Sequence, residues 1–511
     1  MKQSDEIMTK LGISSLRPLQ RDVLRHVASS ESVIACLPTA YGKSLCFQLP
    51  ALLDKNLTIV ISPLIATIND QVQSINRKMS SQVAMRWHSE ISQEERETFN
   101  ISIKKVSLIY CSPESLVHTN LLGKILKFRR VRRVVVDEAH FIQNWGDSFR
   151  PAFKMFPSIF EETGINPEWT IMTATATNST LKCIRDLIKV DFKLVQQKPI
   201  KTNIAYERID IDKMKLGLNF MMQSKKLGAE TAYNMVSTKL AFAAKNEING
   251  KKTLIFCLTR RRVDDVTTYL NGMGILCRAY HGGLSPEDKQ LNADWFTQKN
   301  DAVLVATNAF GVGVDIPDIS NVFHFETPLT VDAYVQETGR AGRNGGKVRA
   351  IYFASESGHS AGNSLISMSY PKASDMERVL EYLLEYSAFT LGLPEVNDAC
   401  YGVDIPFDIH HASKILSIKN RTVMSLIEHL VNAQVLSIDS QLGLPTYILN
   451  KAHNFSIASY ELMKQRVIND YSDMKHYSLL EPNNEVAYLS SFYPFGRPNK
   501  QTLDYDSIDQ D

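Results

Sequence analysis

The sequence has no paired cysteines, little net charge and no long hydrophobic run. Its seven cysteines stand singly, and none forms the CxxC pair that is typical of zinc sites. We therefore predict no zinc, and the scattered cysteines are typical of a reducing compartment. No run approaches the ~18 apolar residues that span a bilayer, and the first ten residues contain no apolar signal core. We expect a cytoplasmic protein without a membrane partner.

The net charge of +2 neither indicates nor excludes a nucleic-acid partner, because such partners are bound by local basic stripes. The chain of 511 residues is long enough for about three domains with cores of their own. Its last ten residues carry four aspartates and no lysine or arginine. We interpret this acidic tail as a solvated chain end, with docking to a partner or mimicry of nucleic acid as the alternative.

Short apolar runs alternate with helical patterns over the first part of the chain, which predicts parallel sheets covered by helices. A first series of runs comprises residues 33–37, 57–61, 107–110, 134–136 and 170–172. A second series comprises residues 253–257, 302–306, 321–325 and 349–353. The two series predict tandem α/β domains at residues 1–205 and 251–358, joined by a helical linker or insertion at residues 206–250.

Residues 359–511 have a mainly helical pattern, which predicts an accessory domain. Two helices flank the short break at 417–420, and two apolar runs at 434–438 and 446–449 follow them around a turn. Helix, turn, helix and hairpin is the order of a winged helix, which we place at about 405–450. An ordinary helical domain with one hairpin explains the pattern equally well, so the pattern alone does not choose between them.

A phosphate-binding loop is indicated by PTAYGKS at residues 38–44, which lies between a predicted strand and a predicted helix. In such loops, backbone N–H groups at the helix N-terminus cradle phosphates. Lys43 is expected to pair with the β and γ phosphates of ATP, and Ser44 to bind Mg²⁺. The first glycine of the usual motif is replaced by Leu37. The cofactor-binding candidates in the loop are Thr39, Gly42, Lys43 and Ser44.

The tetrapeptide DEAH at residues 137–140 follows the predicted strand at 134–136. A carboxylate at the carboxyl end of a parallel strand lies where this type of sheet binds ligands, so we predict that Asp137 also binds Mg²⁺. Glu138 is then placed to orient or deprotonate the attacking water. Both motifs occur in the expected order in one predicted domain, which chance does not readily explain.

Together these motifs resemble those of superfamily 2 helicases and, within them, of the RecQ family. The resemblance covers about residues 10–355 and implies two RecA-like domains. LRPLQ resembles the upstream motif whose glutamine reads adenine, which implies nucleotide binding by Arg17 and Gln20. Residues 62–72 resemble the motif that grips the strand backbone, and residues 112–114 a further phosphate-contacting turn. The implied nucleic-acid contacts in these two motifs are Ser62, Pro63, Gln71, Ser112, Pro113 and Glu114.

Three further motifs extend the resemblance. TATA at residues 173–176 resembles the motif that couples hydrolysis to strand movement, and residues 307–315 resemble the one that bridges nucleic acid and nucleotide. QETGRAGR at residues 336–343 resembles the motif that supplies arginines from the second lobe. An arginine stabilises the negative charge on the γ-phosphate in the transition state. The implied roles are strand contact for His281 and Thr307, nucleotide binding for Gly313 and Asp315, and catalysis for Gln336, Arg340 and Arg343.

The sequence directly after DEAH resembles the aromatic-rich loop that distinguishes RecQ helicases from other members of superfamily 2. It reads FIQNWGDSFRPAF over residues 141–153. Aromatic faces stack on bases with about 1–3 kcal/mol per base, and arginine adds positive charge. Phe153 fits base contact and core packing equally well, and Asp147 and Ser148 stand where the family usually has His and Asp. We expect contacts with nucleic acid from Trp145, Phe149 and Arg150.

The resemblance implies an ATP- and Mg²⁺-dependent DNA helicase that moves 3′ to 5′ on single-stranded DNA, unwinds duplex DNA and serves repair or recombination. Such helicases usually carry a four-cysteine zinc module after the second lobe, but beyond Cys277 this chain has only Cys400. The missing module motivates one alternative, a translocase within a larger complex such as a genome-defence system, and RNA as substrate is another. Intact catalytic groups disfavour a non-catalytic binding subunit. We expect any protein partners to bind the C-terminal domain.

Overall fold

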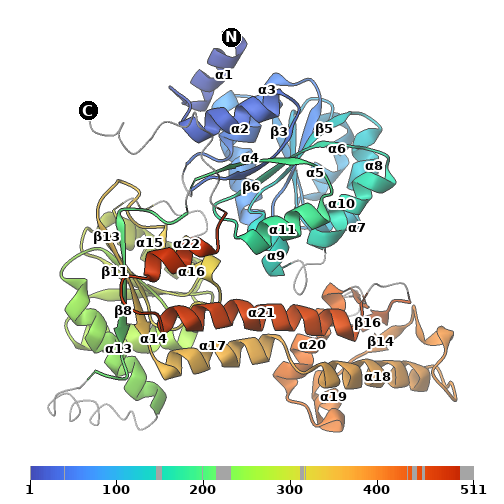
Figure 1. Ribbon diagram of the computed structural model, residues 1–511. Coiled ribbons are helices and arrows are strands. Elements are labelled where there is room, and N and C mark those ends of the chain that lie inside the picture. Colours follow the sequence, from blue (N-terminus) through green and yellow to red (C-terminus); the bar gives the residue numbers. More distant parts are fainter. Residues whose placement is uncertain are drawn as a thin grey trace. The chain divides into compact units, whose positions relative to one another are not determined.

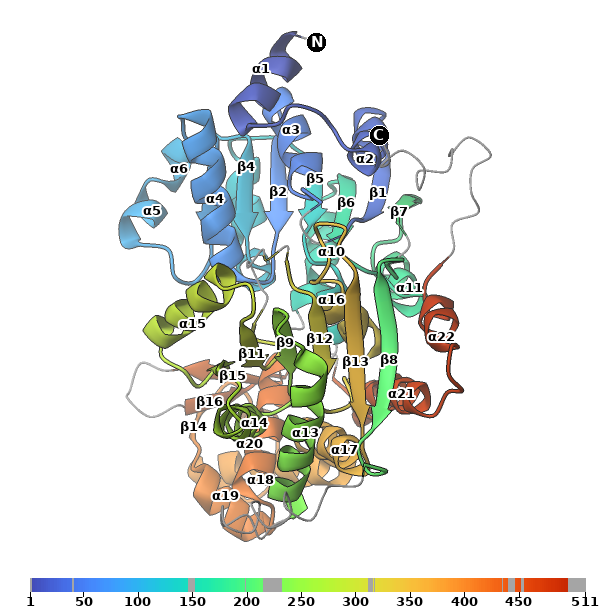
Figure 2. The same cartoon turned by 90° about the vertical axis from the view of Figure 1, so that its left-hand side faces the viewer.

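The computed structural model describes residues 2–38, 41–145, 152–197, 199–214, 232–310, 316, 318–433, 435–439, 446–451 and 455–494. The chain divides into two compact units, coloured along the sequence in Figure 1 and Figure 2. Unit 1 comprises Met1–Gln143, Phe156–Lys201 and Val486–Asp511, and unit 2 comprises Asn144–Met155 and Thr202–Glu485. Among the described residues, no helix combines the length and apolarity needed to cross a membrane.

Unit 1 is built on a seven-stranded parallel sheet with the order β3-β4-β2-β5-β6-β1-β7. The interior strands are almost entirely buried, because helices cover both faces of the sheet. The strands are β1 (Ser32–Cys36), β2 (Leu57–Ile61), β3 (Ala84–Trp87), β4 (Leu108–Cys111), β5 (Val131–Val136), β6 (Glu168–Thr173) and β7 (Phe192–Gln196).

Helices cover this sheet through two apolar layers. One core joins the first four helices to residues such as Val135 and Met172 on one face of the sheet. On the other face, Phe156 and Phe160 contact the ring of Trp169. The helices are α1 (Lys2–Leu11), α2 (Pro18–Ala28), α3 (Leu45–Leu53), α4 (Ile65–Met79), α5 (Gln93–Glu97), α6 (Phe99–Ser102), α7 (Pro113–His118), α8 (Leu121–Leu126), α9 (His140–Trp145), α10 (Ala152–Glu162) and α11 (Asn178–Leu187).

Unit 2 contains a second parallel sheet, six-stranded, with the order β10-β11-β9-β12-β13-β8. Its strands are β8 (Ile204–Asp210), β9 (Thr253–Phe256), β10 (Cys277–Tyr280), β11 (Val303–Ala306), β12 (Asn321–His324) and β13 (Val348–Ala354). The helices among them are α13 (Ala232–Ile248), α14 (Arg260–Gly272), α15 (Pro286–Gln298) and α16 (Val331–Thr338). The predicted fold class of two tandem parallel-sheet α/β domains is confirmed.

The structure corrects the predicted linker at residues 206–250. The strand Ile204–Asp210 pairs with β13 along its whole length and so belongs to the second sheet. Leu240, Ala244 and Ile248 of α13 lie in the same buried core as β9, β11 and β12. α13 covers that sheet, so the described residues of the segment are part of the second α/β domain.

The C-terminal region of unit 2 is mainly helical and contains a small antiparallel sheet with the order β14-β16-β15. α19 and α20 are joined by three residues, among them Ser417 with φ +52°, which gives a helix-turn-helix. This order of helices and strands is that of a winged helix. The elements are α17 (Glu356–Ser369), α18 (Ala373–Thr390), η1 (Asp398–Cys400), β14 (Asp404–Pro406), α19 (Ile409–Leu416), α20 (Asn420–Asn432), β15 (Leu436–Asp439), β16 (Thr446–Leu449) and α21 (Ile457–Ser478).

Tyrosines of the long helix α21 attach this region to the second sheet domain. Tyr471 holds α21 to α17 within the region, because its hydroxyl donates to the carbonyl of His359 at 2.8 Å. Tyr477 makes the contact with the sheet domain, where its ring lies 5.3 Å from that of Tyr334 in α16. After α21 the chain leaves unit 2, and α22 (Glu485–Ser491) leads into the last part of unit 1. There the backbone N–H of Asn178 donates to the carbonyl of Phe492 at 2.9 Å.

We predict that Gly362→Ala destabilises unit 2, because a Cβ at this buried position would lie 2.1 Å from the Tyr471 hydroxyl oxygen. Overpacking of this kind lowers the free energy of unfolding by about 1–3 kcal/mol, which urea denaturation would measure. The matched control is Gly272→Ala in α14, where a Cβ meets open space. It should leave stability unchanged or raise it by up to about 1 kcal/mol. Equal effects of the two substitutions would contradict the prediction.

Candidate active site

The candidate site lies at the carboxyl edge of the first sheet, where the loop 38–44 leaves β1 and the DEAH segment leaves β5, on either side of β6. Three backbone hydrogen bonds fix this edge. Leu37 N–H donates to the carbonyl of Thr173 at 3.0 Å, Asp137 N–H to that of Ile61 at 2.9 Å, and Ala139 N–H to that of Met172 at 2.9 Å. Parallel strands gather functional loops at one edge in this way.

At this edge, Lys43 forms an ion pair with Glu138. Lys43 Nζ lies 3.0 Å from Glu138 Oε1, and the two side chains are 13% and 28% exposed. Burial lowers the pKa of Lys43, but the carboxylates of Glu138 and Asp137 raise it by more, so the net shift is upward and Lys43 is charged. The structure therefore brings together the predicted phosphate-binding cation and the predicted hydrolytic carboxylate.

Asp137 is almost completely buried, with 4% exposure. Its Oδ1 accepts a hydrogen bond from Glu138 N–H at 3.0 Å, and its Oδ2 accepts one from Gln71 Nε2 at 3.2 Å. Burial, together with the neighbouring charge of Glu138, raises the pKa of Asp137 to about 6. Bringing a cation to this carboxylate would favour its charged form, as expected for a metal ligand.

Glu138 and His140 connect the DEAH segment to the TATA motif. Glu138 has φ +49°, a left-handed conformation that is uncommon outside glycine, and the other described non-glycine residues with positive φ are serines and asparagines. His140 Nδ1 lies 3.3 Å from Thr173 Oγ1 and 3.4 Å from Glu138 Oε2. Backbone strain at such a position is typical of functional sites.

The donor set fits Mg²⁺ bound together with ATP. Mg²⁺ prefers oxygen ligands and is usually held by one or two protein groups plus substrate phosphates. Asp137 and the hydroxyl of Ser44, which lies directly before α3, are such groups. The described residues contain no group of three or more His, Cys, Asp or Glu side chains that could hold a metal by themselves. When bound, Mg²⁺ would neutralise phosphate charge, with Lys43 as the protein cation beside it.

Gln20 is buried and contacts the phosphate-binding loop. Its Oε1 accepts from Arg17 N–H at 2.9 Å, and its Nε2 donates to the carbonyls of Tyr41 at 2.8 Å and Gly42 at 3.1 Å. A Cβ at Gly42 would lie 2.6 Å from Gln20 Nε2, and Gly42 has φ +82°, so glycine is required there. The Arg17 guanidinium lies 5.1 Å from the Tyr41 ring centroid. Adenine reading by Gln20 stays a prediction.

Several predicted nucleic-acid contacts have buried side chains. Ser112 accepts a hydrogen bond from Ser115 N–H at 3.2 Å and so caps α7, in which Glu114 is half-buried. Phe153 is fully buried, which supports core packing. Contact with nucleic acid stays a prediction for the buried residues Ser62, Pro63, Ser112 and Pro113. Outside the described residues lie Thr39, Phe149, Arg150, Gly313, Asp315 and the side chain of Trp145.

Unit 2 carries the remaining predicted residues. His281 accepts from Gly283 N–H at 3.1 Å and lies 3.0 Å from Asp264 Oδ1, so it caps a turn, and Thr307 is buried at the end of β11. In α16, Gln336 Nε2 donates to Asp332 Oδ2 at 3.0 Å. Asp332 is not among the residues predicted from sequence, although its spacing of four residues from Gln336 on one helix indicates such a contact. Arg340 and Arg343 are half-buried beyond α16.

We predict that Asp137→Asn stabilises unit 1 at high pH in the presence of EDTA. The pKa of Asp137 in the folded state is about 6, above the usual ~3.9. Stability contributed by the protonated group is therefore present at low pH and lost as the pH rises through 6. Asparagine does not titrate, so the free energy of unfolding of Asp137→Asn minus that of wild type should grow by about 1–2 kcal/mol from pH 5 to pH 8. Urea denaturation would measure this gain, and a pH-independent difference would contradict the prediction.

Comparison with known proteins identifies both α/β domains. Residues 17–184 match the family described as DEAD/DEAH box helicase, and residues 232–345 match the helicase conserved C-terminal domain. The crystal structure of the DUF1998 helicase MrfA bound to DNA and AMPPNP matches with a TM-score of 0.54 and 17% identity, over 89% of this chain and 63% of that one. At this identity the likeness shows the fold.

Curated proteins with similar sequences identify the family more specifically. The probable ATP-dependent DNA helicase RecS of Bacillus subtilis is 30% identical over 73% of this chain and 71% of its own. The putative ATP-dependent RNA helicase R290 of Acanthamoeba polyphaga mimivirus is 34% identical over 66% of this chain and 57% of its own. Across curated relatives of this kind, the matched part spans from 23% to 71% of the relative. The chain belongs to the RecQ family of DEAD/DEAH box helicases.

Proposed function

We propose that this protein is an ATP-driven motor that acts on DNA as a helicase. The observation that carries the proposal is the Lys43–Glu138 ion pair beside the buried carboxylate of Asp137, in a chain of the RecQ family. A lysine that follows a phosphate-binding loop and two carboxylates at a strand end are the groups that MgATP hydrolysis needs. RecS, a DNA helicase by name, supports DNA as the substrate.

In this proposal each group has one task. Lys43 exchanges Glu138 for phosphate oxygens when nucleotide binds, which releases Glu138 to orient or deprotonate the attacking water. Ser44 and Asp137 hold Mg²⁺. The second α/β domain contributes Gln336 and two arginines, Arg340 and Arg343, whose positive charge stabilises the transition state. Because catalytic groups then come from both domains, hydrolysis can be coupled to domain movement and so to travel along a strand, in the 3′ to 5′ direction.

Two alternative functions retain ATP-driven movement along nucleic acid but differ in its outcome or its substrate. A translocase would move along DNA or displace bound proteins without separating strands, and the missing four-cysteine module favours it. RNA as substrate is favoured by the mimivirus relative, which is named an RNA helicase. In either case the segment at about 405–450, whose elements follow the order of a winged helix, is a candidate for holding a duplex or a protein partner.

We predict that Lys43→Ala abolishes ATP hydrolysis stimulated by single-stranded DNA, with a loss of at least about 100-fold, because the phosphate-binding cation is removed. Steady-state phosphate release with and without an oligonucleotide measures this. The matched control is Lys55→Ala at an exposed position after α3, which should hydrolyse ATP like wild type. Normal hydrolysis by Lys43→Ala would contradict the proposed function.

We also predict that the wild-type protein separates a forked DNA duplex that carries a 3′ single-stranded arm, and that a fork with only a 5′ arm stays paired. Strand separation is followed by fluorescence of a labelled strand, with ATP omitted as the control. Displacement of streptavidin from biotinylated DNA without fork opening would instead support the translocase. Stronger stimulation of hydrolysis by RNA than by DNA would support the RNA alternative.

A further inference from the structure

Gln71 connects the segment that resembles a strand-gripping motif to the candidate metal ligand. It lies in α4, and its side-chain amide Nε2 donates to Asp137 Oδ2 at 3.2 Å, across a sequence distance of 66 residues. The contact is possible because β2, which precedes α4, is the neighbour of β5, which precedes Asp137. Within the described part of the chain, the other Asp137 oxygen accepts only a local bond, from Glu138 N–H. Among the described residues, Gln71 is therefore the hydrogen-bond donor that reaches Asp137 from another element.

The same segment holds two buried acceptor atoms without a hydrogen-bond partner among the described residues. These are Gln71 Oε1 and Ser62 Oγ, and the Ser62 side chain is 1% exposed. Buried polar atoms are nearly always hydrogen-bonded in native proteins, by protein groups or by ordered water. A hydrated magnesium ion brings water molecules that donate hydrogen bonds. Gln71 Oε1 belongs to the amide that is bonded to the Asp137 carboxylate, so it is an acceptor that a hydrated ion at this site would satisfy.

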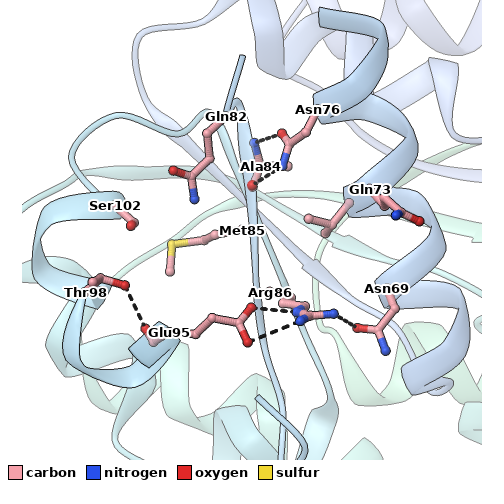
Figure 3. A pocket seen from close by; sticks show the side chains of 11 residues that line it. Asn69, Gln73, Asn76, Gln82, Ala84, Met85, Arg86, Glu95, Thr98 and Ser102 are labelled. Atoms are coloured by element: carbon pink, nitrogen blue, oxygen red, sulfur yellow. Dashed lines mark hydrogen bonds and ion pairs between the residues drawn. The ribbon is translucent and has the colours of Figure 1, made fainter. Parts of the chain in front are cut away.

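The opposite side of α4 is tied to the neighbouring strand. Asn69 Oδ1 accepts from Arg86 Nη1 at 2.7 Å, and Arg86 also pairs with Glu95 at 2.7 Å (Figure 3). Asn76 bonds the backbone of Ala84 through both of its amide atoms, each at 2.9 Å. These residues line a pocket of about 380 Å³. Because these bonds tie α4 to β3, we expect the helix to move as one body. A shift of α4 would then move Gln71 with it.

We propose that Gln71 is a positioning residue that orients Asp137 for Mg²⁺ and transmits the position of α4 to the metal site. The inference rests on the proposed function and deepens it. In this role, Gln71 holds one carboxylate oxygen so that the side chain is fixed before a cation arrives. Groups that hydrogen-bond a metal ligand are part of the site, because they fix the orientation of the ligand. Gln71 then acts through Asp137 instead of through direct contact with a nucleic-acid strand.

The test compares Gln71→Met and Gln71→Lys with wild type in binding of a fluorescent, non-hydrolysable ATP analogue. Methionine keeps the size of the side chain and removes the hydrogen bond, and it should raise the Mg²⁺ concentration at half-saturation about 10-fold. Lysine adds a positive charge that competes with the metal, so its effect should be larger. Binding measured in EDTA should stay within about twofold of wild type for Gln71→Met, because Asp137 acts through the metal.

The matched controls are Gln73→Met and Gln73→Lys, two residues further along α4 at an exposed position in the pocket of Figure 3. Residues two apart on a helix face different directions, so both controls should bind Mg²⁺ and nucleotide like wild type. Thermal unfolding of every variant establishes that it is folded. A single-stranded oligonucleotide should change the half-saturating Mg²⁺ concentration of wild type, and it should change that of Gln71→Met less, because the link through α4 is cut.

Unchanged Mg²⁺ dependence in folded Gln71→Met and Gln71→Lys would overturn this inference while leaving the proposed function intact. Weaker binding of single-stranded DNA by Gln71→Met with an unchanged Mg²⁺ dependence would also overturn it, and would support the direct strand contact predicted from the sequence. If wild type binds no nucleotide in the presence of Mg²⁺, both the proposed function and this inference fail. Equal loss in the Gln71 and Gln73 variants would show a general effect of α4 and contradict the specific role.

Discussion

The hydrogen bonds at the carboxyl edge of the first sheet are the constraint on which the candidate site depends. Leu37, Asp137 and Ala139 each donate a backbone N–H to a carbonyl of the adjacent strand. Their positions fix where two loops leave the sheet, and so Lys43 and Glu138 meet across 95 residues of sequence. Such a pair, mostly removed from water, is tolerated only with close and well-fixed geometry. The sheet therefore fixes the geometry that the ion pair of Lys43 and Glu138 requires.

The interior of both sheets could be predicted from sequence, and the edges could not. Every apolar run of the two predicted series became an interior strand of one of these two sheets, because such strands are covered on both faces and are apolar throughout. The four strands of these two parallel sheets that are missing from the prediction, β3, β7, β8 and β10, are their edges. They are short or contain charged residues such as Arg86, Lys193, Glu207 and Arg278. Edge strands often carry charge, which limits unwanted pairing but weakens their sequence signal.

The residues of the candidate site also fall into a group that could be predicted from sequence and a group that could not. Lys43, Asp137 and Glu138 could be placed from sequence, since each belongs to a short motif that follows a strand end. The amides of Gln20 and Gln71 could not, because their partners, the carbonyls of the phosphate loop and the Asp137 carboxylate, lie far away in sequence. Motif resemblance gave both glutamines ligand contacts, whereas in the structure each uses its amide to hold another part of the site. Their predicted ligand contacts are still to be tested.

The return of the chain to unit 1 through α22 affects how the protein can fold during synthesis. Glu485 pairs with Arg208 in unit 2, and only a few residues later Phe492 accepts a hydrogen bond from Asn178 in unit 1. The ribosome therefore releases the last packed segment of unit 1 after all of unit 2 has emerged. The nucleotide-binding half begins to fold first, since its sheet is made first, yet it is completed last. A chain that stalls late in translation would carry an assembled second domain beside an unfinished first one.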